Sequence, residues 1–91
     1  MKIEKPENFL KRLGARVRLV RQQADLRQED FEDETELSIA ARSLQEIEYG
    51  NANPRIYTLY KIAKRCDVSV PDLLEGAELP LRDLPSKARK Q

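Results

Sequence analysis

The sequence has no histidine and no tryptophan, and its only cysteine is Cys66. Without histidine the commonest general acid–base group is missing, and one thiol cannot form an internal disulfide or a zinc cluster. We interpret Cys66 as a small buried apolar residue. Neighbouring carboxylates such as Glu29 and Asp33 are interpreted as surface charge on a solvated helix. We therefore expect no enzyme, no metal site and no cofactor.

Long hydrophobic runs are also missing from the sequence. No stretch approaches the ~20 apolar residues of a membrane span, and the first residues, MKIEKPENF, lack the apolar core of a signal peptide. The alternation of apolar and polar residues that is typical of strands is not found either. These absences favour a cytoplasmic, all-helical protein with no membrane partner. With 91 residues, of which 40% are hydrophobic, we expect one small domain.

Charge is balanced over the whole chain but not along it. The 17 Lys and Arg residues and 16 Asp and Glu residues give a net charge of +1. Residues 1–24 hold seven basic and two acidic side chains, whereas residues 25–36 hold seven acidic side chains and one basic one, Arg27. Net charge therefore does not indicate a nucleic-acid partner, although it leaves room for a local basic face.

Apolar residues recur with helical spacing along the chain. Leu10, Leu13, Val17, Val20 and Ala24 follow one another at intervals of three and four, which traces one face of a long first helix. Similar patterns and helix-end signals predict five helices in all, over residues 7–24, 28–35, 39–49, 54–66 and 70–75.

Residues suited to helix ends separate these segments. Asp25 tolerates the left-handed conformation and Gly50 takes positive φ freely, so they are predicted to end the first and third helices. Ser and Asn are favoured N-caps, which predicts caps at Ser38, Asn53 and Ser69. After Gly76 the helical pattern fails. We expect residues 1–76 to form the domain and residues 77–91 a C-terminal tail, either flexible or contacting a second subunit through Leu79, Leu81 and Leu84.

An ordered set of motifs links these helices to a known family. Arg21 lies seven residues before Gln28, an Ile-Glu-x-Gly element occupies residues 47–50, and an Asn-Pro pair follows at residues 53–54. The segment LYKIAKRCDVSVPDLL closes the set at residues 59–74. Residues 17–74 therefore resemble the Cro/cI-type, or XRE-family, helix-turn-helix domain. The resemblance implies an all-α, compact five-helix, lambda-repressor-like fold.

Three features depart from the family pattern. Arg27 stands where serine or threonine is usual, and Glu32 replaces the alanine that usually lets the second and third helices pack closely. The stretch from Gln28 to Glu48 is two residues longer than the common spacing. We therefore expect an extended or reshaped turn whose acidic side chains repel phosphates.

The resemblance also implies residue roles. Arg21 and Glu48 are expected to pair inside the domain and to fix the first helix against the end of the third. Gln28 is expected to touch the DNA backbone from the N-terminus of the second helix, where free N–H groups and the helix dipole suit a phosphate. The third helix is the implied recognition helix. Its outward residues form what we call the reading face: Ala40, Ala41, Arg42, Gln45 and Glu46.

The reading face carries side chains that suit the major groove. Arg42 can donate two hydrogen bonds to guanine, Gln45 can address adenine, and Glu46 can accept from cytosine N4. The two alanines fit against thymine methyl groups. Phosphate contacts are expected from Asn51, Asn53 and Arg55. Three further arginines either extend this basic edge or are ordinary solvated charges: Arg16, Arg18 and Arg27.

These features predict a sequence-specific DNA-binding transcriptional regulator, a repressor that binds a two-fold symmetric operator on double-stranded DNA as a homodimer. Proteins of this family and size include phage repressors, restriction–modification controllers and antitoxins, and the sequence does not choose among them. An alternative interpretation assumes the same fold but little or no DNA binding. In that case the acidic surface around residues 29–36 binds a protein partner, such as a toxin or regulator, and the domain is an adaptor or antitoxin.

Overall fold

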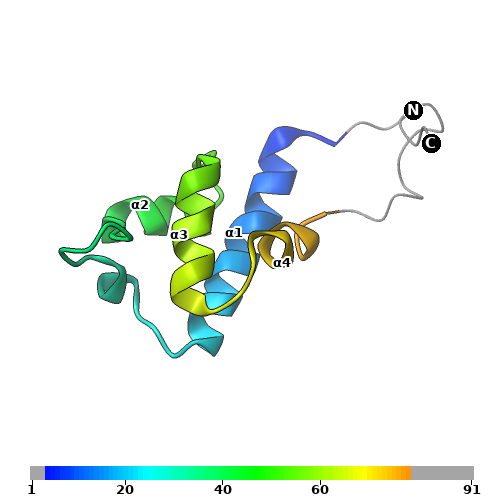
Figure 1. The fold of residues 1–91 in the computed structure, drawn as a ribbon. Helices are drawn as coiled ribbons and strands as arrows, with labels where there is room; N and C mark the ends of the chain where they lie inside the picture. Colours follow the sequence, from blue (N-terminus) through cyan, green and yellow to red (C-terminus); the bar gives the residue numbers. More distant parts are fainter. Residues whose placement is uncertain (1–3, 79–91) are drawn as a thin grey trace.

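The computed structural model describes residues 4–78 (Figure 1). It contains four α-helices and one 3-10 helix: α1 (Pro6–Gln23), η1 (Gln28–Phe31), α2 (Ala41–Glu48), α3 (Ile56–Cys66) and α4 (Val70–Glu75). The described part of the chain contains no strand. The all-helical fold predicted from the sequence is therefore confirmed, with a 3-10 turn in place of one α-helix.

One hydrophobic core joins the helices. The long helix α1 contacts α2, α3 and α4, while η1 contacts α2 on the side of the molecule away from α4 (Figure 1). Burying one large apolar side chain stabilises the fold by roughly 1.5–3 kcal/mol, so a core of this size can hold five short elements together. The largest fully buried side chains come from every element: Leu13, Val17, Phe31, Leu44, Ile62 and Leu73.

The end of α1 follows the prediction. The chain leaves the helix at Ala24, and Asp25 takes the left-handed conformation with φ 61°. The Asp25 and Leu26 N–H groups donate to the carbonyls of Gln22 and Arg21 at 3.0 and 3.1 Å. This pair of bonds is a Schellman motif, which satisfies carbonyls that the end of a helix leaves unpaired.

The predicted second helix over residues 28–35 is wrong in its length and type. Only the 3-10 helix η1 forms, and the backbone is extended at Glu32 with ψ 115°. Local side-chain bonds compete with the helix beyond that point. Asp33 Oδ1 accepts from the Thr35 N–H at 2.9 Å, and Ser38 Oγ accepts from the Asp33 N–H at 3.0 Å. We call residues 32–40, which connect η1 to α2, the acidic loop.

Two predicted helix starts are also wrong. Helix α2 begins at Ala41 rather than after Ser38, because the Ser38 hydroxyl is bonded within the acidic loop. Helix α3 begins at Ile56 with Arg55 in the N-cap position, so Asn53 caps nothing. In contrast, the predicted start of α4 is confirmed. Ser69 Oγ accepts the Asp72 N–H at 3.2 Å, and Asp72 bonds back to the Ser69 N–H.

The packed region extends to Ala77, one residue beyond the predicted domain boundary. Ala77 is fully buried, and its carbonyl accepts from Arg12 Nε on α1 at 2.7 Å. The three leucines proposed as a tail contact, Leu79, Leu81 and Leu84, lie outside the described residues. Within residues 4–78, no helix is long and apolar enough to span a bilayer.

Candidate nucleic-acid interface

Helix α2 is held between the core and solvent. Leu44 and Ile47 are buried against the core, at 0% and 4% exposure. The reading face lies on the other sides of the helix and remains accessible. Ala40 and Arg42 are exposed, and the remaining three residues are half-buried: Ala41, Gln45 and Glu46. The face predicted from the sequence is therefore available to a partner.

Four of the five residues of the reading face line two separate hollows, and Ala41 lines neither. One, which we call the Arg42 pocket, lies between α2 and the segment that leads into α3. It is lined by Ala40, Arg42, Ser43, Glu46, Ile47, Ala52, Pro54, Arg55 and Thr58. It brings three predicted base-reading residues, Ala40, Arg42 and Glu46, beside the predicted phosphate contact Arg55. Asn51 and Asn53 are exposed in the loop between α2 and α3.

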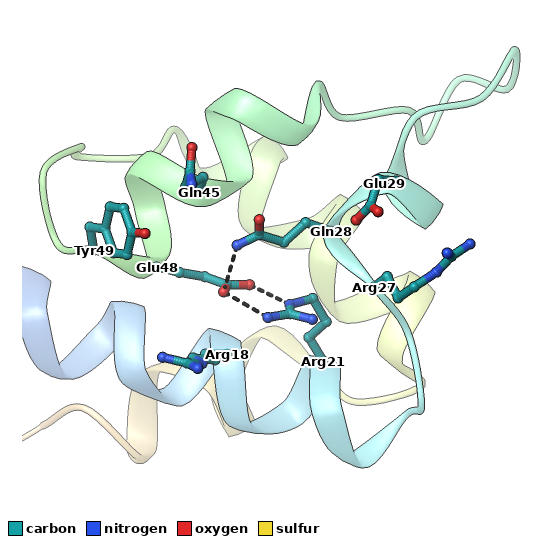
Figure 2. A pocket seen from close by; sticks show the side chains of 8 residues that line it. All are labelled: Arg18, Arg21, Arg27, Gln28, Glu29, Gln45, Glu48 and Tyr49. Atoms are coloured by element: carbon teal, nitrogen blue, oxygen red, sulfur yellow. Dashed lines mark hydrogen bonds and ion pairs between the residues drawn. The ribbon is translucent and has the colours of Figure 1, made fainter.

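The second hollow, the Arg18 pocket, lies between α1, η1 and α2 (Figure 2). It is lined by Arg18, Arg21, Arg27, Gln28, Glu29, Gln45, Glu48 and Tyr49. Gln45 therefore lies in a different hollow from Arg42 and Glu46. The structure does not bring all five residues of the reading face into one pocket.

A buried hydrogen-bond network forms the floor of the Arg18 pocket. Arg21 Nε donates to Glu48 Oε2 at 2.6 Å, and Arg21 Nη2 donates to Glu48 Oε1 at 3.0 Å (Figure 2). Arg21 Nη1 also donates to the Leu26 carbonyl at 2.9 Å. The hydrogen bonds to Glu48 raise the pKa of the Arg21 guanidinium, which therefore stays charged although it is buried. The pair joins α1 to the last residue of α2, as the family resemblance implies.

Gln28 belongs to the same network. Its Nε2 donates to Glu48 Oε1 at 3.1 Å, which uses one of its two amide hydrogens (Figure 2). Gln28 begins the four-residue η1 rather than the α-helix expected there. The helix-dipole argument for a phosphate at this position therefore fails. The DNA-backbone role of Gln28 stays a prediction, for which its second amide hydrogen is one available donor.

The three arginines predicted to extend the basic edge lie in different places and have different partners. Arg18 is exposed and lines the Arg18 pocket. Arg27 also lines it but points away from Glu48 and pairs with Asp30 at 3.1 Å (Figure 2). Arg16 lies elsewhere, because its Nε donates to the Asp72 carbonyl on α4 at 3.2 Å. The basic edge beside α2 is therefore narrower than expected.

Close backbone packing fixes the C-terminal half of α2. A Cβ at Gly14 of α1 would overlap the Ile47 carbonyl and lie 2.6 Å from the Glu48 carbonyl oxygen. Only glycine allows the two helices to approach so closely. Gly50, with φ 79°, ends α2 and turns the chain toward α3, as the sequence predicts. The orientation of the reading face therefore depends on α1 as well as on α2.

Two side chains of α3, Arg65 and Lys61, hold the acidic loop in place, and no motif in the sequence singles them out. Arg65 Nε donates to the Leu37 carbonyl at 3.1 Å, and Arg65 Nη2 donates to Thr35 Oγ1 at 2.8 Å and to Asp33. Lys61 Nζ donates to the Ser38 carbonyl at 3.0 Å. Hydrogen bonds from Thr35 and Arg65 lower the pKa of Asp33 to about 2. These contacts join residues 23 to 32 positions apart, so no local sequence signal marks them.

The tyrosines are neither core residues nor part of the reading face. Tyr49, Tyr57 and Tyr60 are exposed at 59%, 54% and 42%. The rings of Tyr57 and Tyr60 stack with centroids 5.8 Å apart, and Lys61 Nζ lies 5.5 Å from the centre of Tyr57. These rings therefore form a rim on α3 beside the fastened loop.

Cys66 is buried, and burial raises the pKa of its thiol to about 11. A thiol in this state is a poor nucleophile and a poor metal ligand at neutral pH. Among residues 4–78, no group of three or more His, Cys, Asp or Glu side chains is placed to hold a metal ion. The interpretation of Cys66 as a small apolar core residue is confirmed.

Two successive short helices, η1 and α2, are joined by a loop and pack beside α1, and this order is that of a helix-turn-helix domain. A family model described as helix-turn-helix matches residues 17–73, which is more than half of the chain. The chain belongs to this family, and the Cro/cI-type resemblance seen in the sequence is confirmed.

One curated relative gives a more particular comparison. Over 67 residues, the chain is 36% identical to the HTH-type transcriptional regulator DdrOP3 of Deinococcus deserti. The match covers 74% of this chain and 50% of the relative, so the chain spans about half of that protein's length. No solved structure matches the chain.

Proposed function

We propose that the protein is a sequence-specific DNA-binding transcriptional regulator, in which α2 enters the major groove. The carrying observation is the reading face, which stays accessible on a helix whose opposite side is buried and whose end is tied to α1 by Arg21 and Glu48. Family membership and the relative's name support the same class. A rigid helix that presents polar side chains on one face is what direct readout of bases requires.

The Arg42 pocket supports a division of roles within the reading face. Arg42 is the strongest candidate for guanine, because its guanidinium can donate to O6 and N7 together. Glu46, in the same hollow, can accept from cytosine N4 and disfavours phosphate. Arg55 lies on the rim of this hollow, where a phosphate contact would set the position of α2 on the duplex.

The charges near α2 indicate modest affinity for DNA backbone. The acidic loop brings Glu32, Asp33, Glu34 and Glu36 to one end of α2, and all four are exposed. Attraction to phosphates must come from a few side chains, such as Arg18 and Arg55, together with backbone N–H groups. We therefore expect the protein to bind DNA only moderately in total, while its affinity still differs clearly between one base sequence and another.

We further propose that the regulator is a repressor that acts as a homodimer on a two-fold symmetric operator. Half-sites about one helical turn, roughly 34 Å, apart are the usual arrangement for this motif. The proposed dimer contacts are α4 and the segment that follows it.

The test is fluorescence anisotropy with duplex DNA from just upstream of the protein's own gene, with a shuffled duplex as control, at several salt concentrations. We expect tighter binding to the native duplex and a loss of affinity with salt. Arg42→Ala should reduce discrimination by about 1–3 kcal/mol, whereas Arg55→Ala should weaken both duplexes alike. If neither duplex binds at low salt, a selection from random DNA follows, and failure there would reject DNA binding.

A second candidate function is protein binding through the acidic loop. The observation that favours it is that Arg65 and Lys61 hold the loop in one shape while its carboxylates stay exposed. This adaptor or antitoxin role is distinguished by variants. Glu34→Gln and Glu36→Gln should abolish partner binding and leave DNA binding intact or stronger, whereas Arg42→Ala should have no effect on the partner.

A further inference from the structure

Glu32 closes the N-terminal end of α2. Its Oε1 accepts the backbone N–H of Ala41, the first residue of α2, at 2.6 Å. The N-cap residue itself, Ala40, has no side-chain oxygen that could do this. The capping group therefore comes from the start of the acidic loop, nine residues earlier in the chain.

This cap changes the electrostatics of the end of α2. The first N–H groups of a helix carry a partial positive charge and attract phosphates. In α2 the Glu32 carboxylate occupies the position beside the first N–H group where a phosphate would bind. It compensates the helix dipole and leaves a negative charge at this end. Glu32 is exposed, and its neighbours Ala40 and Ala41 are too small to shield it. The second carboxylate oxygen, Oε2, is therefore available as an acceptor next to the reading face.

We propose that Glu32 is a specificity-determining residue, which belongs to the reading face although it lies outside α2. This inference rests on the DNA-binding function proposed above. A fixed acceptor favours the base edge that offers an amino donor, and cytosine N4 is the major-groove edge that offers a donor without a neighbouring ring acceptor. The O6 and N7 acceptors of guanine and the O4 of thymine are disfavoured at the same position. Glu32 therefore selects cytosine at the base that faces the start of α2.

The proposal assigns complementary preferences to adjacent side chains. Arg42, in the first turn of α2, donates and selects guanine, while Glu32 accepts and selects cytosine. Glu32 also repels phosphate, so it lowers affinity for all DNA while it raises discrimination. Its removal should consequently make the protein bind more DNA sequences rather than fewer.

The experiment is a binding selection from random duplexes with the full chain, comparing wild type, Glu32→Gln and Glu32→Ala. The matched control is Glu34→Gln, which removes one exposed carboxylate from the same loop. We expect the wild type to show a preference for cytosine at the base facing the start of α2, distinct from the cytosine preference assigned to Glu46, and both Glu32 variants to lose the former by about fivefold or more while keeping the latter. Binding to shuffled DNA should strengthen in all three variants, and the control should keep the cytosine preference.

Each outcome separates this proposal from its rivals. Glu32→Gln can still accept the Ala41 N–H, so it should fold even if Glu32→Ala does not, and circular dichroism checks this. Unchanged base preferences in Glu32→Gln and Glu32→Ala would overturn the proposal and leave Glu32 as a structural cap only. Loss of the preference in Glu34→Gln as well would overturn it in favour of a general charge effect. Absence of binding by the wild type would reject the proposed DNA-binding function itself.

Discussion

The two ends of α2 are held in opposite ways. At the C-terminal end, Glu48 is buried and bonded to Arg21, and backbone carbonyls lie against Gly14. At the N-terminal end, the attachments are hydrogen bonds to the acidic loop, from Arg65 among others, in a largely exposed setting. Removing one partner of a buried charge pair is costly, whereas each exposed hydrogen bond contributes little. We therefore expect disruption of the C-terminal end to cost more stability than disruption of the N-terminal end.

The largest expected effect comes from breaking the buried pair. Glu48→Ala should destabilise the domain by about 3–5 kcal/mol, because it leaves the Arg21 guanidinium buried without its partner. Urea unfolding followed by circular dichroism measures this. Glu46→Ala, on the same helix, is the control and should cost under about 1 kcal/mol.

The double variant Arg21→Met, Glu48→Leu sharpens the result. Replacing both charges by apolar side chains should recover most of the lost stability, because no unpaired charge remains. A double variant that is as unstable as Glu48→Ala would show that packing, rather than charge pairing, dominates at this end.

The next effect concerns the close approach of α1 and α2. Gly14→Ala should lower stability by about 1–3 kcal/mol, since the new methyl group meets backbone that cannot move aside independently. For a domain of this size, that corresponds to a fall in Tm of about 4 °C or more. The control is Gly76→Ala, whose Cβ would lie 2.6 Å from Nε of the flexible Arg16 side chain. Equal losses of stability in Gly14→Ala and Gly76→Ala would argue that the close contact of Gly14 with the α2 backbone has no special importance.

A smaller and more local effect is expected at the other end. Arg65→Ala should lower the free energy of unfolding by about 1–2 kcal/mol. The loss is small because the hydrogen bonds that are removed are partly exposed. Hydrogen exchange should rise across residues 32–40, including the Ile39 N–H that donates to the Phe31 carbonyl at 2.8 Å, while protection in α1 changes little. Lys64→Ala, an exposed change on the same helix, should leave the loop protected. If Arg65→Ala reduced hydrogen-exchange protection equally across all helices, the two ends of α2 would not differ in how they are held.

This contrast also explains what could be predicted from the sequence. The C-terminal end agrees well with the prediction, because the Gly50 terminator follows from a local motif and the family resemblance implies the Arg21–Glu48 pairing. The helical periods of α1 and α3 likewise depend only on nearby residues. Local patterns of this kind specify which residues face the core.

The N-terminal end could not be predicted in the same way. The helix expected over residues 28–35 is replaced by η1 and the acidic loop, where Asp33, Thr35 and Ser38 bond to the local backbone. Arg65, which holds the loop, lies on another helix, and nothing in the spacing of its neighbours indicates this. Glu32 is unusual for the family, but its cap on Ala41 depends on the loop conformation. The division of the reading face between two hollows has the same origin, since it depends on tertiary packing.

The smallest expected effect is a pH dependence of the loop attachment. The pKa of Asp33 is lowered to about 2, first by the Thr35 side-chain and backbone hydrogen bonds and then by Arg65. A depressed pKa means that the ionised form is favoured by folding, so its stabilising contribution is complete above about pH 4 and is lost as the pH falls through about 2. Asp33→Asn should therefore be less stable than wild type at pH 6, and the two should converge near pH 2. Urea midpoints across this range measure the difference, with Glu34→Gln as the control for loss of one loop carboxylate. A difference that persists unchanged at pH 2 would show that the Asp33 charge does not hold the loop, and the N-terminal end of α2 would then depend on the remaining bonds from Arg65 and Lys61.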